Sequence, residues 1–116
     1  MVKIKRIYEA REPNDGYRIL VDRLWPRGVL KKEAHVDLWM KEVTPSTELR
    51  KWFNHEPEKW AAFSKAYIAE LKQTGAVKEL ITIIRKQKKV TLLYAAKDEE
   101  HTHALVLLAY IKPLLT

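Results

Sequence analysis

The chain has no cysteine and only three glycines among its 116 residues. Without cysteine it can form no disulfide, no zinc–thiolate site and no thiol nucleophile. With so few glycines it has no glycine-rich phosphate loop of the Walker or dinucleotide-binding type. These absences exclude a P-loop enzyme and a conventional dinucleotide binder. The lack of cysteine also fits a reducing cytoplasm.

Long apolar segments are missing as well. The longest apolar run, residues 104–111, is far too short to cross a bilayer. Residues 1–6 are charged and strand-like, unlike the start of a signal peptide. We therefore expect a soluble cytoplasmic protein with no membrane partner.

What the chain does contain is typical of one folded domain. Hydrophobic residues make up 47% of it and charged residues 32%, as in globular proteins. We expect a single domain over residues 1–116, long enough for one hydrophobic core. The net charge is +7, from 22 Lys and Arg against 15 Asp and Glu. This charge favours anionic partners, or it only aids solubility.

Apolar patterning indicates alternating strands and helices. The unbroken run Ile19-Leu20-Val21 predicts a strand buried on both faces, as in parallel sheets. The strands are expected over residues 3–9, 18–23 and 90–94. The helices are expected over residues 32–41, 47–53, 57–73, 77–87 and 100–111, with Ser46 and Thr47 as capping residues for the second.

These elements predict an α/β fold, a small three-layer sandwich. Its sheet is expected to be short and mainly parallel, with about three strands flanked by about five helices. The first two strands are separated by about eight residues, which is too few for a crossover through a helix. That pair is therefore either antiparallel or joined by an irregular loop, and the sequence leaves its direction open.

Polar side chains follow two of the expected strands. Asp22, Arg23, Trp25 and Arg27 come after the second strand, and Lys97, Asp98 and His103 come after the third. In a parallel sheet the carboxyl ends of neighbouring strands share one edge, where ligands bind. We therefore expect a strand-end cleft suited to a phosphate-bearing or nucleotide-like anion.

Each predicted residue has a chemical use. Arginine grips phosphate with two donors, and lysine adds a point charge. Asp22 and His103 are the predicted catalytic residues, as general base or acid. The predicted ligand-binding residues are Arg18, Arg23, Trp25, Arg27, Tyr94, Lys97 and Asp98.

Structural roles compete with these functional ones. Asp22 and Arg23 could form an ion pair that orders the loop, and Trp25 could be a packed plug. Lys97 and Asp98 could form an ordinary polar turn. Whether the protein is an enzyme stays open at this point.

The remaining histidines and tryptophans indicate no further site. His101 and His103 are two residues apart and cannot share a helix face, so no metal site is predicted, and no cofactor is indicated. His35 and His55 are expected at the surface. Trp39, Trp52 and Trp60 are expected on amphipathic helices and in the core.

A second basic cluster, Arg85, Lys86, Lys88 and Lys89, closes the expected fourth helix. Cations at that position complement the helix dipole. The alternative is a nucleic-acid-binding surface. A third reading is an interaction domain with no small ligand.

Four segments carry a family resemblance, residues 15–28, 44–51, 91–97 and 103–107. With them the chain resembles the bacterial DUF488 family, in its short YeaO-like branch. The resemblance implies a small α/β domain but no particular reaction. Longer members have segments like Val21-Asp22 and like Lys97, Asp98 and His103. This chain has no cysteine in the late segment, and Ala104 stands where longer members tend to have arginine. A reaction of longer members that needs this thiol or this guanidinium is therefore not implied for this chain.

Overall fold

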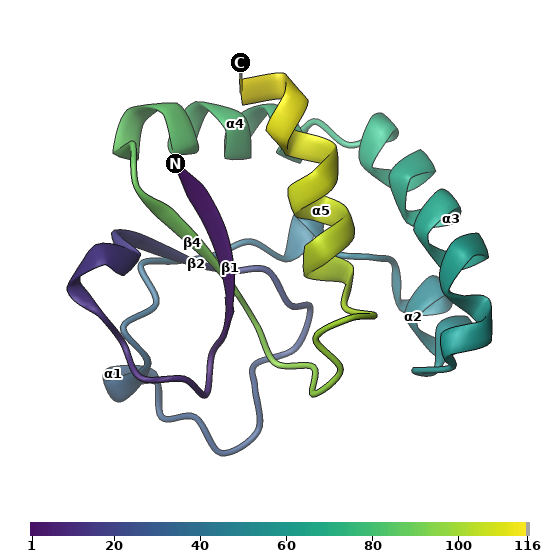
Figure 1. Ribbon diagram of the computed structural model, residues 1–116, viewed down its shortest axis with the longest axis horizontal. Coiled ribbons are helices and arrows are strands. Elements are labelled where there is room, and N and C mark those ends of the chain that lie inside the picture. The colour runs from purple at the N-terminus through teal and green to yellow at the C-terminus, as the bar shows by residue number, and fades with distance from the viewer. Residues whose placement is uncertain (116) are drawn as a thin grey trace.

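The computed structural model describes residues 1–115, which form a four-stranded parallel sheet beside helices (Figure 1). The strands are β1 (Val2–Arg6), β2 (Tyr17–Leu20), β3 (Leu38–Trp39) and β4 (Val90–Tyr94). Their order across the sheet is β1-β4-β2-β3. The α/β class and the parallel sheet are thus confirmed, with one short strand more than expected.

Five α-helices accompany the sheet within the described residues. They are α1 (Lys31–Ala34), α2 (Thr47–Phe53), α3 (Trp60–Gln73), α4 (Ala76–Gln87) and α5 (His103–Ile111). α2 has the expected bounds, and a 3-10 turn, Pro57–Lys59, precedes α3. α5 begins later than expected because the Thr102 side chain caps it and accepts the N–H of Ala104.

The helix expected over residues 32–41 is wrong. The chain forms only the single turn α1, which ends at His35 with a left-handed φ of 52°. It then forms β3, where Leu38 and Trp39 pair with Ile19 and Leu20. Hydrogen bonds to β2 decide this outcome, since the N–H of Met40 donates to the carbonyl of Leu20. Tertiary pairing here overrides local helical propensity.

The first two strands run in the same direction without touching. Each pairs in parallel with β4, which lies between them. The connection is an irregular segment, residues 7–16, so the loop alternative holds and the antiparallel one does not. The buried carboxylate of Asp15 anchors this segment, with Lys3 and Lys5 each at 3.1 Å and Arg18 also paired to it.

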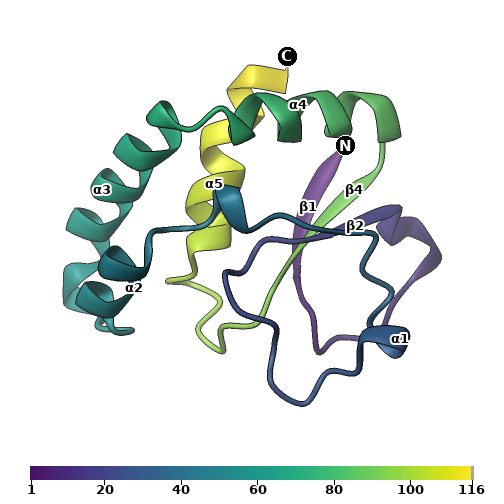
Figure 2. The same ribbon diagram turned by 180° about the vertical axis from the view of Figure 1, so that it is seen from behind.

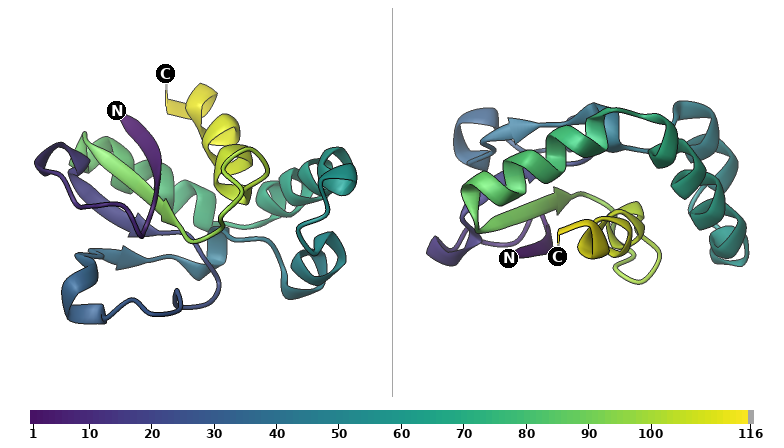
Figure 3. Two further views of the ribbon diagram at one scale, coloured as in Figure 1. Left: turned by 60° about the horizontal axis from the view of Figure 1, so that its bottom comes forward. Right: turned by 90° about the horizontal axis from the view of Figure 1, so that it is seen from above.

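The main core lies on the face of the sheet that α4 and α5 cover. Leu80 of α4 and Leu107 of α5 join Ile19 and Leu92 in one apolar cluster. Each such fully buried aliphatic side chain stabilises the fold by about 2 kcal/mol. In the right-hand view of Figure 3, α4 passes over the sheet and α5 lies beside β1.

The opposite face is covered by connecting segments and α1. Leu20 and Leu93 are buried there with Ile7 and Ala34. Figure 2 shows α1 and the segment before it at the end of the molecule away from α4. The third layer of the sandwich therefore consists mostly of loops. No helix within residues 1–115 has the length and apolar character that a membrane span requires.

Candidate functional site

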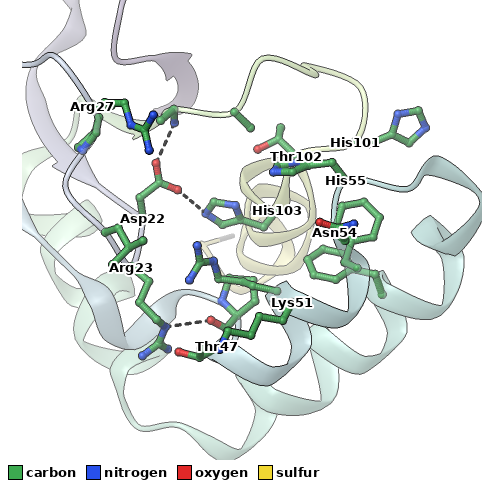
Figure 4. Close-up of a pocket in the computed structure, with 18 of the residues that line it drawn as sticks. Asp22, Arg23, Arg27, Thr47, Lys51, Asn54, His55, His101, Thr102 and His103 are labelled. Atoms are coloured by element: carbon green, nitrogen blue, oxygen red, sulfur yellow. Dashed lines mark hydrogen bonds and ion pairs between the residues drawn. The ribbon is translucent and has the colours of Figure 1, made fainter.

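A cavity of about 730 Å³ opens where β2 and β4 end (Figure 4). Three parts of the chain form most of its lining, to which Phe63 of α3 also contributes. One is the segment after β2, from Asp22 to Arg27. The second is α2 with the residues that follow it, and the third is the turn before α5 together with its first residue. The size is in the usual range for a small-molecule site.

Asp22 and His103 point toward each other across this cavity (Figure 4). Oδ1 of Asp22 lies 3.4 Å from Nε2 of His103. The N–H of Ala95, directly after β4, donates to Oδ2 of Asp22 at 2.8 Å. The segments that follow β2 and β4 therefore meet in one hollow, as their parallel pairing predicts.

The environment of Asp22 acts on its charge in two directions. Burial raises the pKa of the Asp22 carboxyl above its usual value. His103, the Ala95 amide and the Arg50 guanidinium oppose that rise by favouring the carboxylate. The side chain is still 17% exposed, so it can meet a ligand in the cavity.

His103 is fixed by the end of β2. Its Nε2 is hydrogen-bonded to the backbone carbonyl of Val21. A carbonyl only accepts, so Nε2 must carry the hydrogen. In the neutral ring, Nδ1 is then the nitrogen with a free lone pair. A proton transfer from a ligand to neutral His103 would have to go to Nδ1.

Arg23 and Arg27 both line the cavity but differ in their contacts. Arg23 donates to the carbonyl of Pro45 at 3.0 Å and to that of Thr44 at 3.4 Å. It therefore ties the loop after β2 to the start of α2 and makes no ion pair with Asp22. Arg27 is exposed, and no hydrogen bond or ion pair engages its guanidinium within residues 1–115. Arg27 is free to bind an anion.

Two further cations come from α2, and the sequence reasoning missed both. Arg50 and Lys51 both lie on α2 and line the cavity. Ser46 positions this helix, since its Oγ accepts the N–H of Leu49 at 3.2 Å, while Glu70 accepts both Ser46 donors. The segment over residues 44–51 carried part of the family resemblance, but its pattern indicated only a helix start.

The turn after α2 brings two more side chains to the cavity. Asn54 and His55 follow each other with left-handed φ angles of 45° and 55°. Such conformations cost about 1 kcal/mol or more for non-glycine residues and cluster at functional sites. His55 is exposed, as expected, and it also lines the cavity.

Trp25 combines packing with a place in the cavity wall. Its Nε1–H donates to the carbonyl of Val29 at 2.7 Å, and its ring meets Trp39 edge-on at 5.4 Å. Trp39 in turn donates to the backbone carbonyl of Asp22 at 2.6 Å. The two tryptophans thus hold the loop that carries Asp22.

Four predicted ligand-binding residues do not line this cavity. Arg18 is 3% exposed and pairs with Asp15 on the other face of the sheet. Tyr94 is buried in the main core. Lys97 is exposed but outside the lining. Asp98 is a turn residue, since it accepts hydrogen bonds from the backbone and the Nδ1 of His101.

The tryptophan expectations hold only in part. Trp60 packs against the core beside Phe63. Trp39 lies on β3 and not on a helix. Trp52 is 46% exposed, with Lys59 over its ring at 5.0 Å. The core placement of Trp52 was therefore wrong.

The charge balance of the cavity is strongly positive. Among residues 1–115 its lining has four permanent cations, Arg23, Arg27, Arg50 and Lys51, against the single carboxylate of Asp22. Three of the four histidines, His55, His101 and His103, also line it. Within the described residues no group of three or more His, Asp or Glu side chains could hold a metal ion. The arrangement suits an anion.

Comparison with known proteins gives one consistent result. The family described as "Inactive DUF488-N3 subclade" matches residues 1–116. The chain is 48% identical over 113 residues to the uncharacterised protein YeaO of Escherichia coli, covering 97% of this chain and 98% of that protein. It is 41% identical over 106 residues to the uncharacterised protein Rv3073c of Mycobacterium tuberculosis, with 91% and 89% covered. No solved structure matches the chain.

Proposed function

This chain belongs to the DUF488 family, in the subclade described as inactive DUF488-N3, and we propose that it binds a phosphate-bearing or nucleotide-like anion. The ligand site is the cavity between the ends of β2 and β4, α2 and the start of α5. One observation carries the proposal, the excess of four permanent cations over one carboxylate around a single cavity of about 730 Å³.

The four cations differ in whether their side chains are already bonded to the protein. Arg27 and Lys51 line the cavity without side-chain partners within residues 1–115, so neither must give up a bond to bind an anion. Arg50 also lines the cavity and is half-buried. Charge-assisted hydrogen bonds from such groups contribute about 1.5–3 kcal/mol each. Arg23 mainly holds the two walls of the site together through the carbonyls of Pro45 and Thr44.

The contacts of Asp22 and His103 favour a protein that binds its ligand without converting it. Asp22 and His103 are close enough to exchange a proton, but Nε2 of His103 already donates to Val21. The family description also calls the subclade inactive. Incubation with phosphate esters should therefore give no turnover, and release of phosphate above a blank would instead make Asp22 and His103 catalytic residues.

A matched pair of lysine variants tests the binding proposal. Lys51 and Lys86 are both exposed and both lie in the last turn of a helix, but only Lys51 lines the cavity. In a calorimetric titration with AMP, Lys51→Ala should weaken binding about tenfold. Lys86→Ala, which removes the same charge, should leave it nearly unchanged. Equal effects of the two variants would mean that only the net charge matters.

Nucleic-acid binding through Arg85, Lys86, Lys88 and Lys89 is the second candidate. All four side chains are exposed, and within residues 1–115 only that of Arg85 is hydrogen-bonded, donating to the carbonyl of Leu114. This cluster lies before β4, whereas the cavity lies after it. In a gel shift the second candidate predicts affinity that falls steeply with salt and is lost when Lys86 and Lys89 become alanine. Retained affinity in that double variant would exclude it.

A further inference from the structure

Within the described residues, Asp22 is the one carboxylate that lines the cavity. Asp22 lines the cavity together with Arg27, Arg50 and Lys51. Its Oδ2 accepts the Ala95 N–H, and its Oδ1 lies 3.4 Å from Nε2 of His103. Each carboxylate oxygen can accept about two hydrogen bonds, so both oxygens keep accepting capacity toward the cavity.

A carboxylate in such a place discriminates between oxyanions. It accepts hydrogen bonds and cannot donate them. An oxyanion that carries a hydrogen can donate it to Asp22 while its other oxygens bind the cations. An oxyanion without hydrogen brings only negative charge, and two like charges in contact repel each other. The cations attract both kinds of ion, so the carboxylate is the group that distinguishes them.

This discrimination needs the ionised form of Asp22. Burial raises the pKa of Asp22, and His103 from α5, Arg50 from α2 and the Ala95 amide oppose that rise by favouring the carboxylate. Its backbone is also fixed, since Trp39 of β3 donates to the Asp22 carbonyl at 2.6 Å. A site preorganised in this way loses more free energy with the wrong partner than a mobile one does.

We infer that Asp22 makes the cavity selective for a tetrahedral oxyanion that carries a hydrogen, and therefore for phosphate over sulfate. The inference rests on the proposed function and narrows its ligand class to phosphate groups that keep a hydrogen, which a phosphate monoester such as AMP does only in its singly charged form. At neutral pH inorganic phosphate retains at least one hydrogen, whereas sulfate retains none. The two ions are alike in shape, and the doubly charged form of phosphate has the same charge as sulfate, so comparing that form with sulfate isolates the hydrogen.

Calorimetric titration of the full chain with inorganic phosphate and with sodium sulfate, at equal ionic strength, tests this. The wild-type chain should bind phosphate at least about tenfold more tightly than sulfate. In Asp22→Asn the ratio should fall to about threefold or less, mainly because sulfate binds better, since an amide can donate to it. Arg27→Gln is the control, and it should weaken both ions while leaving their ratio unchanged.

The outcomes separate the inference from the proposed function. If AMP and phosphate bind but sulfate binds equally well, the selectivity is absent and the inference fails while the binding site stands. An unchanged ratio in Asp22→Asn, or binding of AMP without binding of inorganic phosphate, also overturns the inference. If no phosphate-bearing probe binds, both fail. The wild-type ratio needs no variant, so it decides even if Asp22→Asn does not fold.

Discussion

Oδ1 of Asp22 lies 3.4 Å from Nε2 of His103, and this contact joins the segment after β2 to the first residue of α5. The two residues are far apart in the sequence and meet because β2 and β4 are parallel neighbours. Among residues 1–115, Asp22 is the only carboxylate of a cavity lining that also contains four permanent cations.

Asp22→Asn should not destabilise the protein at neutral pH. Burial raises the pKa of Asp22 in the folded state, so the folded protein holds this proton more tightly than the unfolded chain. That contribution to stability is present at acid pH and is lost as the pH rises through the folded pKa. The variant should gain stability relative to the wild type between acid and neutral pH, as measured by urea unfolding. If Asp22→Asn instead loses stability relative to the wild type over that pH interval, the raised pKa of Asp22 is contradicted.

Asp15→Asn should destabilise the fold strongly, by about 3 kcal/mol. Asp15 is 1% exposed and pairs with Lys3, Lys5 and Arg18. Burial alone would raise the pKa of Asp15, but the Glu12 amide and these cations outweigh it and hold the pKa well below its usual range.

The pH dependence of Asp15 therefore has the opposite sign to that of Asp22. Its stabilisation is present above the unfolded pKa and is lost as the pH falls below about 4. Urea unfolding over an acid pH series should show a smaller difference between wild type and Asp15→Asn at the lowest pH. Glu99→Gln, at an exposed position, serves as the control and should have little effect. A difference that grows toward acid pH would contradict the ion cluster.

The sequence predicted the parts of the fold that depend on local apolar pattern. Two such patterns could be recognised from the sequence alone. They are the apolar run of β4, all of which is buried, and the amphipathic stripe of α4. β3 could not be recognised, because a two-residue strand has no pattern of its own. It exists through pairing with β2 and through Asp37, which accepts the N–H of Arg18 at 2.8 Å.

The candidate site was predictable where it follows directly from strand ends. Asp22, Arg23, Trp25, Arg27 and His103 all line the cavity. Arg50 and Lys51 were missed because the location of α2 depends on tertiary contacts such as Glu70 with Ser46. Arg18 lies near the start of β2, away from the cavity at the strand's end, and pairs with the buried Asp15, while Tyr94 packs into the main core.

Arg23→Ala and Arg27→Ala should separate stability from binding. Arg23 donates to two backbone carbonyls, so its loss should cost about 1–2 kcal/mol of stability as well as weaken anion binding. Arg27 has an exposed side chain, so Arg27→Ala should change stability by less than about 0.5 kcal/mol. It should still weaken AMP binding about tenfold or more.

Thermal unfolding and calorimetry on the same samples make this comparison. Lys97→Ala should change neither quantity, because Lys97 is exposed outside the cavity lining. If Arg27→Ala unfolds the domain, Arg27 is structural and its place in the site is wrong.

Gly16→Ala should be among the most damaging small substitutions. Gly16 has a φ of 66°, and a Cβ there would lie 2.3 Å from the backbone oxygen of Lys89. That oxygen accepts the N–H of Tyr17 at the start of β2, so the clash would push β2 away from the chain before β4. We expect a loss of more than about 2 kcal/mol in urea unfolding. Gly75→Ala, where a Cβ meets nothing within 4 Å, should be tolerated.

An NMR titration of the isotopically labelled chain with AMP tests the central claim most directly. The account predicts backbone amide shifts that saturate together at residues 22–27, 47–55 and 95–103, with little change at residues 85–89. Shifts confined to residues 85–89, or no saturable shifts at all, would contradict an anion site at the end of β2 and β4.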